Sequence, residues 1–250
     1  MTRGFDLAQD DRGVISVRVA RPPDNSFTVA MCRELAELLT SPPAGGRVLR
    51  LSGAPGVFCR GREPSGAEPD AARETVEALT EVTRLLAQTD LVTVAEVDGE
   101  AAGFGVGLVA QCDLAVASSS SQFWFPEVTH GLAPALVLSW LPRLVGRRQA
   151  FWLTATGQAL MAIDAQRLGL INLVAEPEAL SDRVDELIET VLRFSSEVLA
   201  EIKRDLRDFD AVDQSGAYRM AGDRLLLASV IKGSQPAVDG SGGPAVSLDL

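Results

Sequence analysis

The sequence contains little histidine and little cysteine. His130 is the single histidine in 250 residues, and three cysteines stand at positions 32, 59 and 112. One imidazole excludes a His-rich metal centre and every Ser-His-Asp or Cys-His scheme that does not use His130. Three cysteines without CxxC spacing indicate neither a disulfide framework nor a zinc site, so we expect a protein of the reducing cytoplasm that binds no metal.

Long apolar runs are also absent. No stretch of about 20 apolar residues is free of charge, and residues 1–13 contain no apolar core of signal-peptide length. We therefore expect a protein that neither enters nor crosses a membrane. Lys and Arg total 23 against 34 Asp and Glu, and the net charge of −11 disfavours binding to nucleic acid or to an anionic membrane surface. A local basic pocket for one phosphorylated ligand is compatible with this charge.

The residues that are present are typical of a folded globular domain. Hydrophobic residues make up 46% of the chain and charged residues 23%. Short β-branched runs begin at Gly13, Arg47, Leu91 and Asp113, and longer amphipathic patterns lie between most of them. This alternation predicts an α/β fold with parallel strands.

Helices are expected between these strands. Residues 28–39 have apolar side chains at helical spacing, and Ser26 or Thr28 is available as the N-cap. Glycine, proline and acidic residues predict a mobile loop from Glu63 to Asp70. The helix expected after this loop has a core face made of Val76, Leu79, Val82 and Leu86.

Helical patterns dominate after Pro134, and they end at glycine or proline. A strand at 170–176 interrupts them, and a long helical pattern covers residues 178–209. Residues 233–250 are rich in small residues and proline, which predicts a disordered tail. We therefore expect one domain over residues 1–232, with its core at about 10–175 and C-terminal helices at about 178–232.

A glycine-rich segment follows the strand at 91–97. Gly103, Gly105 and Gly107 invite a dinucleotide-binding interpretation, but Leu108 stands where that fingerprint requires its third glycine. The acidic residue expected after the next strand is missing too. Close helix packing would explain the glycines. The interpretation that fits better is an oxyanion hole, because backbone N–H groups at a helix start can approach a ligand oxygen.

Four motifs in order resemble the crotonase, or enoyl-CoA hydratase/isomerase, superfamily. Residues 21–39 match its proline-asparagine turn and first helix, and residues 51–64 match its strand and F-x-x-G loop. Residues 94–135 are similar to its central block, with a Cys-Asp pair and a Pro-Glu pair after an aromatic strand. Residues 153–180 resemble the segment that contains Gly-Leu-x-x-x-Val. The resemblance extends to about Phe209.

The resemblance implies a crotonase-like α/β fold, a ββα superhelix with a C-terminal helical region. It implies homotrimers or hexamers that bind acyl-CoA thioesters and stabilise an enolate, with no tightly bound cofactor and with coenzyme A as part of the substrate. In such proteins two backbone N–H groups hold the thioester oxygen. By position these groups belong here to Arg62 and to Phe104, which stands where the family most often has glycine.

Four residues beside these two amides are candidate substrate-binding residues. Gly61 and Gly103 precede the amides, and Arg60 is placed to meet the CoA phosphates. Glu63 is a reserve acid that could reach the acyl pocket. The alternative interpretation of the charged residues is a solvated surface loop.

The acid–base residues depart from the hydratase pattern. The family's hydratases typically use two glutamates to hold and split water, and this chain has Gly107 at the first position and Glu127 at the second. A single carboxylate can take a proton from one carbon and return it to another. The pattern therefore resembles the family's 3-enoyl-CoA to 2-enoyl-CoA isomerases. The alternatives are a hydratase or lyase that uses Glu127 with His130 or Glu63, and a non-catalytic acyl-CoA-binding accessory subunit.

Glu127 and His130 lie close together in the sequence after the aromatic strand. Glu127 has neighbours that could desolvate it and raise its pKa, and the alternative role is helix capping. His130 could replace the missing acid or position a substrate carboxylate, and the alternative is a packing or hydrogen-bonding role. The neighbours expected to desolvate the glutamate are Phe123, Phe125, Pro126 and Val128.

Overall fold

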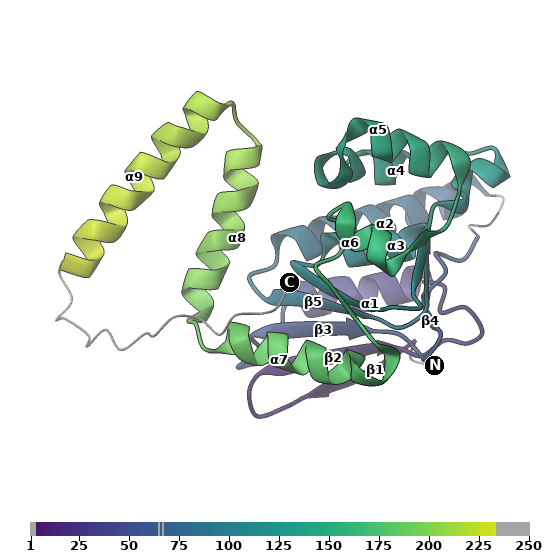
Figure 1. Cartoon of the computed structure of the whole chain (residues 1–250), viewed down its shortest axis with the longest axis horizontal. Coiled ribbons are helices and arrows are strands. Elements are labelled where there is room, and N and C mark those ends of the chain that lie inside the picture. The colour runs from purple at the N-terminus through teal and green to yellow at the C-terminus, as the bar shows by residue number, and fades with distance from the viewer. Residues whose placement is uncertain (1–3, 65, 67, 234–250) are drawn as a thin grey trace. The chain divides into compact units, whose positions relative to one another are not determined.

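The computed structural model describes residues 4–64, 66 and 68–233. Its chain forms two compact units, residues 1–199 and residues 200–250. Figure 1 shows the elements. The strands are β1 Phe5–Gln9, β2 Val14–Val19, β3 Val48–Ser52, β4 Val57–Cys59, β5 Val92–Val97, β6 Glu100–Ala102, β7 Leu114–Ser118, β8 Gln122–Trp124, β9 Leu160–Met161 and β10 Leu173–Ala175. The α-helices are α1 Val29–Thr40, α2 Pro69–Gln88, α3 Phe104–Gln111, α4 Ala135–Leu138, α5 Leu141–Thr156, α6 Ala162–Arg167, α7 Leu180–Leu192, α8 Ser196–Asp210 and α9 Gln214–Gly233, with 3-10 helices η1 Pro126–His130 and η2 Pro177–Ala179.

The large sheet has the strand order β1-β2-β3-β5-β7-β10. Strand β1 pairs antiparallel with β2, and the other pairings are parallel. Its strands alternate between two faces, as the period of two requires. Leu49 and Leu51 join the main hydrophobic core with α1 and α2, whereas Arg50 between them bonds to α7. The expected parallel α/β architecture is confirmed.

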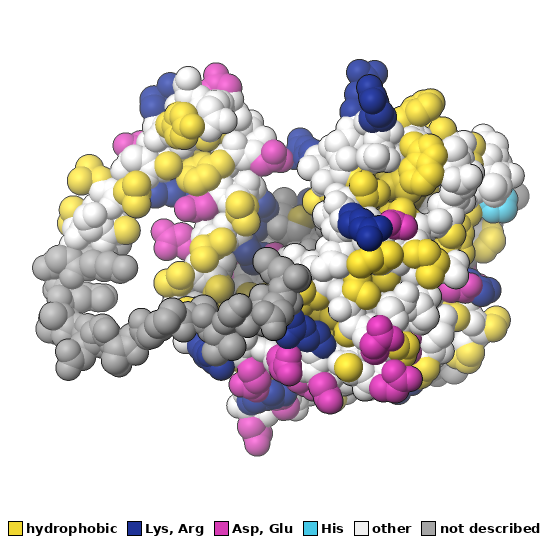
Figure 2. Space-filling view, in the orientation of Figure 1, with side chains coloured by type: hydrophobic (Ala, Val, Ile, Leu, Met, Phe, Trp, Pro, Cys, Tyr) yellow, Lys and Arg dark blue, Asp and Glu magenta, His cyan; other side chains and the backbone are white. Residues whose placement is uncertain are grey.

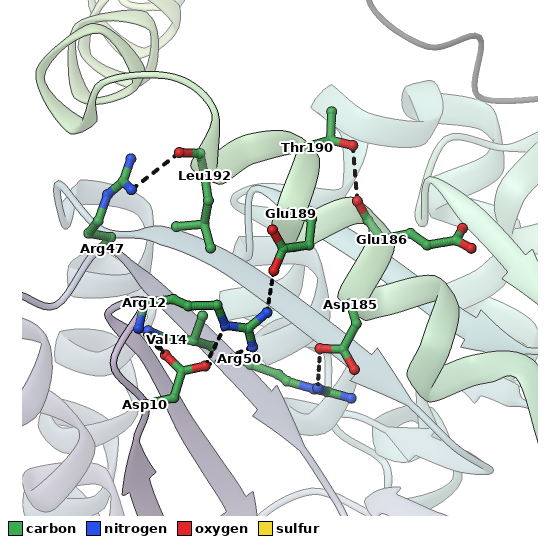
Figure 3. Close-up of polar contacts among 10 residues, drawn as sticks. All are labelled: Asp10, Arg12, Val14, Arg47, Arg50, Asp185, Glu186, Glu189, Thr190 and Leu192. Carbon is green, nitrogen blue, oxygen red and sulfur yellow. Dashed lines mark hydrogen bonds and ion pairs between the residues drawn. The ribbon is translucent and has the colours of Figure 1, made fainter.

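Polar contacts hold α7 against the large sheet (Figure 3). Arg12 pairs with Glu189, and Arg50 Nη1 lies 3.1 Å from Asp185 Oδ1. Arg50 Nε also lies 2.6 Å from Glu96 Oε2, and both side chains of this pair are about 15% exposed. Because this pair is nearly buried between two neighbouring strands, removing either partner would leave an uncompensated charge in a poorly solvated place.

The small sheet has the order β4-β6-β8-β9. Strands β4, β6 and β8 are parallel neighbours, and β9 pairs antiparallel with β8. The carboxyl ends of these three parallel strands therefore meet at one edge of the sheet. The residues that follow them along the chain are brought together at that edge.

Several helix boundaries follow from local chemistry. Thr28 caps α1 by accepting a hydrogen bond from the Met31 N–H at 3.1 Å, as one of the two expected caps. Gly157 ends α5 in the left-handed conformation, with φ of 62°. Helix α2 begins at Pro69, because proline is favourable in a first helical turn. The loop expected from Glu63 to Asp70 therefore included two residues, Pro69 and Asp70, that belong to the helix.

Two other expectations are wrong. Val76 is 60% exposed, and Thr75 takes its place on the core face of α2. The long helical pattern at 178–209 is two helices, α7 and α8, separated at residues 193–195. The break has a local cause, because Ser195 Oγ accepts a hydrogen bond from the Val198 N–H at 3.3 Å and so starts a new helix.

The unit of residues 200–250 is described as far as residue 233. Arg224 on α9 pairs with Asp205 and Asp208 on α8, and its guanidinium carbon lies 5.1 Å from the centre of the Phe209 ring. Several large apolar side chains of this unit remain exposed, including Leu206 at 68%. Gly233 ends α9, so the remainder of the expected tail, residues 234–250, lies outside the described residues.

Candidate active site

Three functional candidates stand directly after the three parallel strands of the small sheet. Arg62 follows β4, Phe104 follows β6 and Glu127 follows β8. They line one pocket of about 370 Å³. The structure thus brings together the two proposed amide donors and the proposed base. The pocket is lined by Arg60, Gly61, Arg62, Pro64, Gly103, Phe104, Pro126, Glu127, His130 and Leu132.

The Phe104 amide lies at the start of α3. The first N–H groups of a helix have no acceptor within the helix and carry the positive end of its dipole. Gly103 has φ of 51°, a conformation that favours glycine, and its N–H donates to the Trp124 carbonyl at 2.9 Å. That bond fastens the start of α3 to β8, beside the glutamate.

Helix α3 packs directly on strand β4. A Cβ atom on Gly105 would lie 2.1 Å from the Cys59 carbonyl oxygen, which is far closer than any real contact. The absent side chain at position 105 therefore sets the distance between the two chain segments that carry the amides.

Arg62 forms an isolated parallel bridge with Phe27. The Phe27 N–H donates to the Gly61 carbonyl and the Phe27 carbonyl accepts from the Glu63 N–H, each at 2.9 Å. In such a bridge the neighbours of Arg62 make the bonds, so the Arg62 N–H faces away from Phe27. Gly61 has φ of 122° at this turn, which a residue with a side chain rarely adopts.

The Glu127 carboxylate is turned inward beside Gly103. Its Oε1 lies 3.0 Å from the position that a Cβ atom on Gly103 would take. Its Oε2 is buried, and no donor from the described part of the chain reaches it. Burial raises the pKa of Glu127 above the ordinary value of 4.5, although its own backbone N–H, Arg62 and His130 oppose the shift. A raised pKa and an unpaired oxygen are properties of a general base.

The four residues expected to desolvate Glu127 differ in their burial. Phe123 and Phe125 are 1% and 2% exposed, whereas Val128 is 38% exposed and faces solvent. Pro126 lines the pocket beside the glutamate.

A second, largely apolar pocket of about 300 Å³ adjoins the first. The two share Arg62, Phe104, Glu127 and Leu132. Its other walls come from α2 and from residues 133–137, and Val76 is one of them. Sequence periodicity assigned Val76 to the core and missed its place in this wall, since cavity walls and cores are both apolar.

The Phe104 ring packs into the protein and does not fill the pocket that Arg62 and Phe104 line. It lies 5.5 Å from the Phe27 ring in an edge-on arrangement and is 8% exposed. Its remaining surface lines both pockets.

Of the other charged candidates, some line the pocket of Glu127 and one does not. Arg60 lines the first pocket and pairs with Glu100. Glu63 pairs with Arg21 and lines neither of the two pockets that contain Glu127. The structure thus brings His130 and Arg60 to the site and leaves the reserve acid outside it.

The position of the missing second glutamate, Gly107, lies on α3 beside Trp140. A Cβ atom on Gly107 would lie 3.7 Å from Cζ2 of the buried Trp140, in ordinary contact. Among the described residues that line the two pockets, Glu127 alone is acidic. No group of three or more His, Cys, Asp or Glu side chains that could hold a metal ion occurs in residues 4–64, 66 and 68–233. No helix in those ranges has the length and apolarity to span a bilayer.

The site and the fold can now be compared with known proteins. A family model described as enoyl-CoA hydratase/isomerase matches residues 9–235. The chain belongs to this family. It is 32% identical over 194 residues to 1,2-epoxyphenylacetyl-CoA isomerase of Escherichia coli, covering 73% of this chain and 74% of that protein.

Solved structures of this family share the fold. An enoyl-CoA hydratase of Mycobacterium smegmatis superposes with a TM-score of 0.84 at 25% identity, covering 94% of this chain and 98% of that one. A putative enoyl-CoA hydratase of Thermobifida fusca in complex with CoA gives a TM-score of 0.80 at 26% identity, covering 92% and 95%. The expected crotonase-like fold is confirmed.

The charges beside Glu127 predict how activity depends on pH. The proposed base must be ionised to accept a proton, so kcat/KM should rise with pH through a pKa above 4.5. His130 lowers the pKa of Glu127, and His130→Gln should therefore shift this acid limb to higher pH. A pH–rate profile of both proteins measures the shift. An unchanged limb would show that the imidazole does not act on the base.

Proposed function

We propose that this family member isomerises 3-enoyl-CoA thioesters to 2-enoyl-CoA thioesters with one glutamate base. The observation that supports this most strongly is Glu127, which alone is acidic among the described residues that line the two pockets and has a buried oxygen without a partner among them. The similarity to a protein named 1,2-epoxyphenylacetyl-CoA isomerase supports isomerisation of a CoA thioester, whereas other similar proteins are named enoyl-CoA hydratases.

In the proposed reaction, the thioester oxygen accepts hydrogen bonds from the Arg62 and Phe104 amides. The C2–H bond breaks, its proton passes to the Glu127 carboxylate, and its electron pair delocalises over C2, C3, C4 and the thioester carbonyl as a dienolate. Glu127 then returns the proton to C4, which moves the double bond from C3–C4 to C2–C3. The apolar second pocket would hold the acyl chain.

A panel of CoA thioesters tests this function. The protein is incubated with 3-enoyl-CoA and 2-enoyl-CoA esters, and products are followed by chromatography and mass spectrometry. Isomerisation gives a new retention time at unchanged mass, and a substrate deuterated at C2 should carry part of its label to C4. Binding of every ester without turnover would instead favour an accessory acyl-CoA-binding subunit.

Hydration is the second candidate, because His130 lines the same pocket as Glu127. A hydratase that used this pair would add the mass of water to a 2-enoyl-CoA ester. His130→Gln would then abolish the addition, whereas in an isomerase it would only shift the pH profile.

We also propose that the protein assembles as a homotrimer or a hexamer. Support comes from exposed apolar side chains on α5, where Phe151 is 72% exposed, and from Tyr218 and Leu225 on α9, each 70% exposed. Figure 2 shows hydrophobic side chains gathered on the face that carries α5. Light scattering should give a multiple of three times 26.5 kDa. The mass of a monomer would contradict the assembly.

A further inference from the structure

The direction of the Arg62 N–H depends on what holds the carbonyl at the other end of the same peptide. That carbonyl belongs to Gly61, and in a planar trans peptide it points opposite to the N–H. The Gly61 oxygen accepts two hydrogen bonds, from the Phe27 N–H at 2.9 Å and from Cys59 Sγ at 3.2 Å. These two donors therefore fix the direction of the Arg62 N–H, and Arg62 lines the pocket.

The segment of residues 24–27 acts as a template for the loop of residues 60–63. Besides the Phe27 bond, the Arg60 N–H donates to the Asp24 carbonyl and the Glu63 N–H donates to the Phe27 carbonyl, each at 2.9 Å. The loop thus takes its path from residues 24–27 through three backbone hydrogen bonds. Any displacement of this segment would displace the amide.

Asn25 fixes the template to the strand from which the loop emerges. It is 1% exposed and adopts φ of 54°, which asparagine tolerates better than most residues. Its Nδ2 donates to the Val57 carbonyl at 2.7 Å, and its Oδ1 accepts from the Arg21 N–H at 2.9 Å. Val57 begins β4, and β4 leads into the loop. The Asn25 side chain therefore links the segment of residues 24–27 to the strand that leads to the Gly61–Arg62 peptide.

We propose that Asn25 is a positioning residue for the oxyanion hole, which orients the Arg62 amide through the segment of residues 24–27 and the Gly61 carbonyl. This inference rests on the proposed function, because it requires the Arg62 amide to bind the thioester oxygen. Asn25 touches no reacting atom and lines neither of the two pockets that contain Glu127.

The test compares Asn25→Gly with the wild-type protein. Glycine keeps the φ of 54° accessible and removes the side-chain hydrogen bonds to Arg21, Val57 and Phe58 without adding charge. We expect kcat to fall about 10- to 100-fold with KM changed less than about threefold, since a displaced donor is lost mainly from the transition state.

The matched control is Thr93→Val, which removes hydrogen bonds to Asp113 from an equally buried side chain in the large sheet. It should lower the melting temperature and leave kcat unchanged.

A spectroscopic measurement separates orientation of the amide from general destabilisation. The probe is 2,4-hexadienoyl-CoA, whose absorbance shifts to longer wavelength when hydrogen-bond donors polarise its conjugated carbonyl. We expect the wild type and Thr93→Val to show this shift at saturation and Asn25→Gly to lose most of it. A folded Asn25→Gly variant that keeps both kcat and the shift would overturn the role of Asn25 alone. A wild type that binds the probe without any shift would overturn the amide cradle and the proposed function.

A second pair of variants applies if Asn25→Gly does not fold. Cys59→Ala removes one of the two donors on the Gly61 carbonyl, and Cys59→Ser replaces it with a hydroxyl. We expect kcat and the spectral shift to fall about three- to tenfold in Cys59→Ala and to recover in Cys59→Ser. If Cys59→Ala keeps the wild-type kcat and the wild-type spectral shift, the proposal that hydrogen bonds to the Gly61 carbonyl orient the Arg62 amide is wrong.

Discussion

Replacing Glu127 with glutamine is expected to lower kcat by about 10³-fold while CoA-ester binding is largely preserved. Glutamine matches the shape of glutamate but cannot accept a proton, and no other carboxylate among the described residues lines the two pockets. Single-turnover assays and ester titrations measure the two effects separately. The control is Glu178→Gln, which changes an exposed carboxylate on η2 and should leave kcat unaltered. Undiminished turnover in Glu127→Gln would remove the residue from the mechanism.

The same substitution should stabilise the fold at neutral pH. Burial raises the pKa of Glu127 in the folded protein, so its stabilising contribution is fully present below the unfolded value of about 4.5 and is lost as pH rises through the folded pKa. At pH 7 the buried carboxylate costs stability that a neutral amide does not. The melting temperature of Glu127→Gln should exceed that of the wild type at pH 7, and the difference should shrink toward pH 4. A lower melting temperature at pH 7 would contradict the burial of a charge.

Gly105→Ala is expected to destabilise the protein by about 3 kcal/mol and to reduce kcat/KM by about 100-fold. The new Cβ would lie 2.1 Å from the Cys59 carbonyl oxygen, a backbone atom that cannot rotate away. Helix α3 must therefore move off β4 and carry the Phe104 amide with it. Urea unfolding and steady-state kinetics measure both losses.

Gly107→Ala on the same helix is the matched control. Its Cβ would meet Trp140 at an ordinary 3.7 Å, and alanine in a helix is favoured over glycine by about 0.5–1 kcal/mol. Stability should be equal or slightly higher than in the wild type. Equal losses in both variants would show that the contact of position 105 with β4 does not determine the result.

The regular elements could be predicted where local apolar pattern decides them. Strands β2, β3, β5 and β7 are short β-branched runs buried by parallel pairing, and α1 begins at its expected threonine cap. Strand β1 was not predicted because Phe5 and Leu7 alternate with Asp6 over too few residues to form a pattern, and Leu7 is 53% exposed. Strand β4 has three residues, too few for a pattern to be visible.

The candidate site could be predicted only in part. The residues that follow β4, β6 and β8 were identified by resemblance to family motifs, and apolar neighbours predicted the desolvation of Glu127. Other features of the site depend on contacts between segments that are distant in the sequence. They are the unpartnered Oε2 of Glu127, the hydrogen bonds of the Asn25 side chain and the closeness of Gly105 to Cys59. No local pattern encodes such contacts.

The main-chain donors proposed after β4 and β6 would change which substitutions inactivate the enzyme. An amide survives almost any exchange of the side chain attached to it, so Arg62 and Phe104 are poor targets for inactivation by random substitution. Inactivating substitutions are instead expected at residues that do not contact the thioester, such as Gly105, which packs on Cys59. A screen for inactive alleles would therefore identify the scaffold before it identified the cradle.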